Sequence, residues 1–131
     1  MNLIIGGAFQ GKTDFARARF SLKNEDIFVC TAENVPDFSK KCVKHLEEFA
    51  LFSLRRGEEP RAVLEDCRDQ WAGSVLILND ISCGVVPMDA ETRAWREACG
   101  RMAAYLAGEA DTVTRLFCGI PQVLKGGGDR G

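Results

Sequence analysis

Met1-Asn2-Leu3-Ile4-Ile5 runs directly into Gly6-Gly7-Ala8-Phe9-Gln10-Gly11-Lys12-Thr13. The first five residues form a short apolar run with β-branched side chains, which predicts a buried strand. Glycines end this run, and a helix is expected from Lys12 to about Phe20. These residues therefore predict a strand, a glycine-rich turn and a helix in direct succession.

The glycine loop has the spacing of a phosphate-binding motif. Gly6 and Gly11 stand five positions apart and precede Lys12-Thr13, which fits GxxxxGK(S/T). Glycines let several backbone amides face phosphate oxygens, the lysine ammonium bridges the β and γ phosphates, and the following helix directs its positive end at the same anion. A plain strand-to-helix turn is the alternative, but it does not account for Lys12-Thr13. The predicted nucleotide-binding residues are Gly6, Gly7, Ala8, Phe9, Gln10, Gly11, Lys12 and Thr13.

A triphosphate site of this kind also needs magnesium. The Thr13 hydroxyl is the expected first ligand, and a carboxylate at the end of another strand commonly supplies a second anchor. Asp80 directly follows the apolar run Val75 to Asn79 and is the best candidate. A turn-forming aspartate is the alternative interpretation of Asp80.

The rest of the chain alternates strand-like and helix-like segments, which predicts one α/β domain. We expect a P-loop NTPase-like fold, with a mostly parallel sheet and helices on both faces. Residues 1–125 form this single nucleotide-binding domain, and residues 126–131 form a flexible glycine-rich tail. The predicted strands are 26–30, 74–80, 112–118 and a short 122–125, and the predicted helices are 36–56, 61–71 and 89–108.

Composition excludes several classes of protein. Seventeen basic and nineteen acidic residues give a formal net charge of -2, which argues against a nucleic-acid binder. No apolar run reaches the roughly 20 residues that span a bilayer, and no targeting signal is recognisable. The six cysteines form no CxxC pair and only one histidine accompanies them, so we expect free thiols in a reducing cytoplasm rather than a zinc site.

These motifs resemble one family. The loop Gly6 to Thr13 has the form Gly-Gly-Ala-x-x-Gly-Lys-(Ser/Thr) of the bifunctional adenosylcobinamide kinase and adenosylcobinamide-phosphate guanylyltransferase of cobalamin biosynthesis. The segment Asn79 to Pro87 resembles that family's Asn-Glu-Val-Gly-x-Gly-Ile-Val-Pro. The helix that follows has the matching spacing, with Arg93, Trp95-Arg96 and Gly100 in place of Arg-x-Phe-Arg-x-x-x-Gly.

The resemblance implies two reactions. A triphosphate, ATP or GTP, phosphorylates the aminopropanol hydroxyl of adenosylcobinamide, and GTP then guanylylates an enzyme histidine that passes GMP to the phosphorylated corrinoid. His45 falls at the position of this nucleophile. Together with Lys12 of the loop and Asp80 after the strand, it completes the predicted set of catalytic residues. A histidine on the polar flank of a helix is the alternative interpretation of His45. The resemblance also implies a homo-oligomer.

The chain departs from the family in its middle part. Phe49 stands where the family has an arginine four residues after the histidine, and the chain is markedly shorter than full-length members. Two other functions therefore stay open: a nucleotide-binding sensor or partner protein that lacks corrinoid chemistry, and a P-loop kinase of another small molecule.

Overall fold

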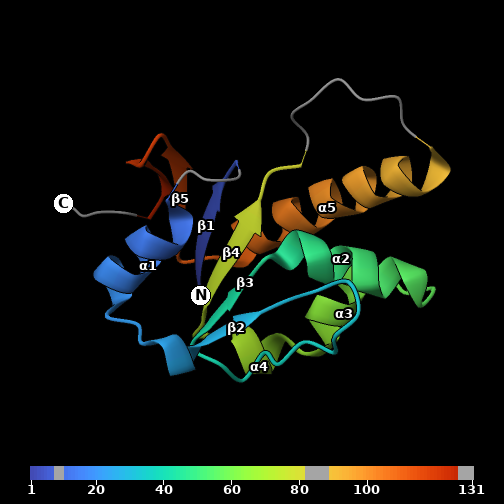
Figure 1. Ribbon diagram of the computed structural model, residues 1–131, viewed down its shortest axis with the longest axis horizontal. Helices are drawn as coiled ribbons and strands as arrows, with labels where there is room; N and C mark the ends of the chain where they lie inside the picture. Colours follow the sequence, from blue (N-terminus) through green and yellow to red (C-terminus); the bar gives the residue numbers. More distant parts are fainter. Residues whose placement is uncertain (8–10, 82–88, 127–131) are drawn as a thin grey trace.

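Six strands form one sheet in the computed structural model, which describes residues 1–7, 11–81 and 89–126 (Figure 1). The strand order is β2-β3-β4-β1-β5-β6. All neighbours are parallel except the β5–β6 pair, which is antiparallel. The strands are β1 (Asn2–Gly6), β2 (Ile27–Val29), β3 (Cys42–Lys44), β4 (Val75–Asn79), β5 (Thr112–Phe117) and β6 (Ile120–Lys125). The expected α/β fold with a mostly parallel sheet is confirmed.

Helices cover both faces of the sheet (Figure 1). They are α1 (Lys12–Phe20), α2 (Leu46–Arg55), α3 (Pro60–Asp66), α4 (Arg68–Trp71) and α5 (Ala90–Glu109), with a 3₁₀ turn η1 at Asn24–Asp26. Alternate residues of each strand face opposite ways, so β1 sends Ile4 towards α1 and Leu3 towards the other helices. Near-continuous apolar strands such as β4 result from this two-sided burial.

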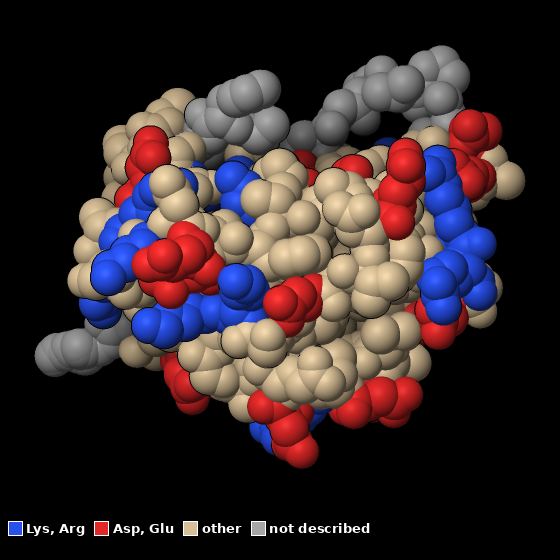
Figure 2. Space-filling model, turned by 60° about the horizontal axis from the view of Figure 1, so that its bottom comes forward, with Lys and Arg blue, Asp and Glu red and all other residues tan. Residues whose placement is uncertain are grey.

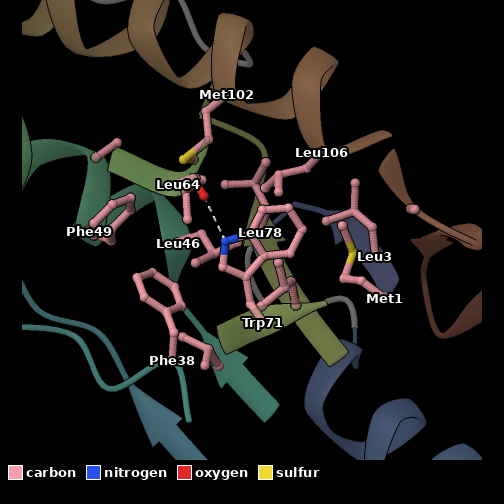
Figure 3. Packing of buried hydrophobic residues seen from close by; sticks show 14 of the residues in the cluster. Met1, Leu3, Phe38, Leu46, Phe49, Leu64, Trp71, Leu78, Met102 and Leu106 are labelled. Atoms are coloured by element: carbon pink, nitrogen blue, oxygen red, sulfur yellow. Dashed lines mark hydrogen bonds between the residues drawn. The ribbon is translucent and has the colours of Figure 1, made fainter. Parts of the chain in front are cut away.

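The larger core lies between the sheet and helices α2 to α5 (Figure 3). Trp71 is the largest fully buried side chain in it, and its indole Nε1 donates to the Leu64 carbonyl oxygen at 2.9 Å. Phe38 and Phe49 meet edge to face, with ring centroids 5.3 Å apart. The smaller core packs Ala16 of α1 against the opposite face of the sheet.

One predicted helix is wrong. The segment 36–56 was expected to be helical throughout, but Cys42–Lys44 is strand β3 and helix α2 starts only at Leu46. The apolar positions of this segment fit a helical period, yet backbone pairing of β3 with β2 and β4 takes precedence. The other predicted elements are present with small shifts of their ends, and the predicted helix 61–71 is divided into α3 and α4.

Four further expectations concern composition and the carboxyl end. The five cysteines within the described part of the chain are free thiols. Among the described residues, no helix is both long and apolar enough to cross a membrane. On the face drawn in Figure 2, basic side chains lie among acidic ones. The predicted tail 126–131 lies outside the described residues, apart from Gly126.

Candidate functional site

The carboxyl ends of β1, β3 and β4 meet at one edge of the sheet, as they must when neighbouring strands are parallel. Gly6 ends β1 opposite Asn79 of β4, and the backbone N–H of Asp80 donates to the Gly6 carbonyl oxygen at 2.8 Å. This edge is where ligands bind in open α/β sheets. Asp80 therefore lies beside the first glycine of the predicted phosphate loop.

Two glycines shape the loop. A Cβ atom on Gly6 would lie 2.6 Å from the Leu116 carbonyl oxygen of β5, so only glycine permits this close strand contact. Gly11 has φ of +80° and precedes the first residue of α1, a left-handed conformation that glycine adopts without strain. Ala8, Phe9 and Gln10, also predicted to bind nucleotide, lie outside the described residues.

Lys12 is a buried cation at the start of α1, only 6% exposed. Its ammonium donates to the Gly7 carbonyl oxygen, so the side chain is folded over its own loop. Burial lowers the pKa of Lys12, the Glu47 carboxylate raises that pKa in part, and the charge of Lys44 lowers it. A polyphosphate at this point would supply the negative charge that a buried ammonium lacks.

Thr13 follows Lys12, and its hydroxyl oxygen accepts a hydrogen bond from the Lys44 ammonium at 3.1 Å. The Thr13 hydroxyl and the Asp80 carboxylate supply oxygen donors, the type that Mg²⁺ prefers. Among the described residues, no three histidine, cysteine or acidic side chains gather as a metal cluster. A site built on one hydroxyl and one carboxylate needs no such cluster, because phosphate oxygens and water complete the coordination of Mg²⁺.

His45 lies between β3 and α2. Its φ is +62°, which is uncommon outside glycine and marks a backbone constraint, and its carbonyl oxygen accepts from the N–H groups of Glu48 and Phe49. No hydrogen bond joins its imidazole to another residue in the described ranges. Lys44, the residue directly before His45, contacts Thr13 through its side chain. His45 thus lies at the end of a strand rather than on the flank of a helix.

Glu47 is a residue that motif-based reasoning missed. Its side chain is 4% exposed, and its two carboxylate oxygens accept from the backbone N–H and the side-chain amide of Asn79, each at 3.0 Å. Its carbonyl oxygen accepts from the Trp95 indole at 2.7 Å. Glu47 therefore links α2 to the end of β4 and to α5. Its burial depends on how α2 packs against β4 and α5, so the sequence offered no signal for it.

A cavity of about 530 Å³ opens beside the loop, under α5 and on the face of the sheet opposite α1. Gly6, Gly7 and Asp80 line the cavity on the side of the phosphate loop, and Phe117 of β5 also lines it. Arg96 of α5 and Arg115 of β5 also line it, and the remaining lining is mostly apolar. Such a combination suits an organic ligand with a polar end. Arg93, by contrast, is exposed and does not line the cavity.

Comparison with known protein families identifies the family to which a chain with this site belongs. The family model described as cobinamide kinase / cobinamide phosphate guanyltransferase matches residues 42–124, which is more than half of the chain. The chain belongs to this family. The cobinamide kinase / guanyltransferase family comprises P-loop NTPase-like transferases of cobalamin biosynthesis that use nucleoside triphosphates. The matched range contains His45, Glu47, Asp80 and both cavity arginines, whereas the glycine loop precedes it. No match was found among curated proteins.

Proposed function

We propose that this protein transfers the γ-phosphoryl group of ATP or GTP to the hydroxyl of adenosylcobinamide. The observation that supports it best is the convergence of the loop lysine Lys12, the Thr13 hydroxyl and Asp80 on one strand edge, in a chain of this family. Lys12 neutralises charge on the transferring phosphoryl group, and Thr13 with Asp80 holds Mg²⁺, which supplies further charge neutralisation when bound. In this proposal the protein is a homo-oligomer, as the family resemblance implies.

The cavity under α5 is the place we assign to the acceptor arm. Its volume of about 530 Å³ is in the range of sites for small organic ligands, and it adjoins Gly6, Gly7 and Asp80. The short aminopropanol arm would enter it, while the corrin ring stays outside. Arg96 and Arg115 then face the end of the arm that receives the phosphate, and guanidinium groups suit that product.

A matched pair of glycine variants tests the acceptor site. Gly100 lines the cavity and Gly108 does not, yet both lie on α5 with no atom within 4 Å of an added Cβ. We expect Gly100→Leu to raise the KM for adenosylcobinamide about tenfold or more, with the Kd for nucleotide unchanged, because the added side chain fills the cavity. Gly108→Leu should leave both constants unchanged. Equal effects of the two variants would refute the placement.

The phosphoryl transfer itself is tested by incubating the protein with adenosylcobinamide, ATP and Mg²⁺. Mass spectrometry should detect phosphorylated cobinamide, and Lys12→Ala should abolish its formation. Nucleotide binding without product would instead favour the sensor function or a different acceptor.

A second activity, guanylyl transfer, is supported by the position of His45 one residue from Lys44, which contacts Thr13. In this step a neutral imidazole nitrogen attacks the α-phosphorus of GTP and pyrophosphate leaves. The phosphate of the phosphorylated cobinamide then displaces the imidazole and takes the GMP group. Intact mass after incubation with GTP and Mg²⁺ should show a gain of one GMP group that His45→Ala loses. A gain that persists in His45→Ala would exclude this nucleophile.

A further inference from the structure

Lys44 is the last residue of β3, a strand that sequence patterns did not predict. Its ammonium nitrogen lies 3.1 Å from the Thr13 hydroxyl oxygen, although 31 positions separate the two residues in sequence. The contact follows from topology, because β3 and β1 flank β4 and their carboxyl ends share one edge of the sheet. A second lysine thus reaches the phosphate loop from outside the loop motif.

The positive charges of Lys44 and Lys12 lie close together without a paired carboxylate among the described residues. Lys44 lies close enough to Lys12 to disfavour its charge, and neither ammonium forms an ion pair with a carboxylate of the described residues. Glu47 is the acidic group whose charge Lys12 senses most, but both of its oxygens already accept from Asn79. One buried and one partly buried ammonium group next to a helix amino end repel each other unless an anion joins them.

The Thr13 hydroxyl cannot keep this partner when the proposed substrate binds. Thr13 would hold Mg²⁺ through its hydroxyl oxygen, the same oxygen that accepts from Lys44. An ammonium group 3.1 Å from the same oxygen would then face a divalent cation at short range. A polyphosphate bound at the loop would offer the Lys44 ammonium negative oxygens in place of the Thr13 hydroxyl.

We infer that Lys44 is a second phosphate-binding residue, which contacts the polyphosphate of the nucleoside triphosphate from strand β3. This inference rests on the proposed nucleotide site and adds a residue that the glycine-loop motif does not contain. Lys44 holds the Thr13 hydroxyl in the free protein and exchanges it for a phosphate oxygen on binding. Its location directly before His45 also fixes the triphosphate relative to that imidazole.

The chain offers a matched control at the other end of the same strand. Lys41 directly precedes β3, its side chain is 76% exposed, and its nearest acidic partner, Asp26, is 4.0 Å away. Lys44→Met and Lys41→Met remove the same charge from opposite ends of β3. Lys44→Arg keeps the charge, and urea unfolding of all three variants checks that the fold persists.

The experiment measures Kd for GTP, ATP and inorganic tripolyphosphate by calorimetry, with Mg²⁺ and separately with EDTA. We expect Lys44→Met to weaken binding of all three about tenfold or more, as loss of a charge-assisted hydrogen bond predicts. Lys41→Met should stay within about twofold of the wild type, and Lys44→Arg should recover most of the affinity. Weakening in EDTA as well would show that Lys44 contacts phosphate rather than acting through the metal.

Three outcomes separate this inference from the proposed function. If Lys12→Ala abolishes binding while Lys44→Met binds as the wild type does, the inference is overturned and the nucleotide site stands. If Lys44→Met weakens binding but the wild type never phosphorylates cobinamide, the inference stands and the proposed reaction fails. A wild-type protein that binds none of the three anions overturns both.

Discussion

At the residue scale, the loop glycines and the buried polar side chains define what the site can do. Gly6 ends β1 where the Leu116 carbonyl oxygen of β5 leaves no room for a side chain. Gly11 has a left-handed backbone that starts α1 with Lys12 pointing at its own loop. These constraints come from the backbone, and they place the ammonium before any ligand arrives.

Gly6→Ala should therefore destabilise the protein, because its Cβ would lie 2.6 Å from a backbone oxygen and strands β1 and β5 would have to separate. We expect a loss of about 1–3 kcal/mol in the free energy of unfolding, as overpacking typically costs. Urea unfolding followed by circular dichroism measures it. Gly73→Ala is the control, since no atom lies within 4 Å of its added Cβ. An equal loss in both variants would contradict the steric explanation.

Some residues of the candidate site could be proposed from the sequence, and others became apparent only in the structure. Lys12, Thr13 and Asp80 could be proposed as site residues from the sequence, because each stands at a fixed place in a motif or directly after a clear strand, and their roles stay predictions. Lys44 and Glu47 could not, because their roles depend on strand β3, whose three residues carry too little pattern to outweigh a helical period. Only the pairing of β3 with β2 and β4 brings these side chains to the loop.

At the scale of elements, Glu47 joins three of them. Its carboxylate holds the end of β4 through Asn79, and its carbonyl oxygen receives the Trp95 indole from α5. Helix α2 thereby fixes where β4 ends, and Asp80 is the next residue. The predicted helix 89–108 differs from α5 by one residue at each end, because an aspartate at the start of a helix is a clear sequence signal. Asp89 is the N-cap, and its side chain accepts a hydrogen bond from the Thr92 N–H at 2.7 Å.

Glu47→Ala should destabilise the protein by about 1–3 kcal/mol, because two donors of Asn79 lose their acceptor in a buried place. Glu47→Gln should cost less, since its amide oxygen still accepts from the Asn79 backbone N–H. Chemical denaturation compares them with Glu48→Ala, which removes a half-buried carboxylate one position away. If Glu48→Ala proves as costly as Glu47→Ala, the carboxylate does not act as this link.

At the scale of the whole molecule, the two cores contain ionisable thiols. Burial, with the nearby charges of Glu47 and Glu48, raises the pKa of Cys30 and of Cys99 to about 12. Burial also raises the pKa of Cys42, to about 11. The unfolded chain loses these protons near the ordinary thiol value of 9.0, so between pH 9 and the folded pKa values the folded protein binds more protons.

Stability should consequently fall as pH rises above about 9, by about 1.4 kcal/mol per pH unit for each such thiol. Urea unfolding at a series of pH values from neutral to alkaline measures this decline. Cys99→Ala removes one of the thiols, and its stability should decline less steeply with pH than that of the wild type. If stability declines with pH equally steeply in the wild type and in Cys99→Ala, the Cys99 thiol has the same pKa in the folded and unfolded states.

The position of β1 in the sheet has a consequence for how the chain acquires its structure. β1 is central in the strand order, yet it pairs with residues 75–79 on one side and 112–116 on the other. During synthesis residues 2–6 emerge before residues 75–79 and 112–116, so β1 has no complete set of partners until β5 has emerged. Pairings of such high contact order form slowly, so an apolar strand stays unpaired until residues 112–116 are made, and in that interval its unpaired edges are exposed to aggregation.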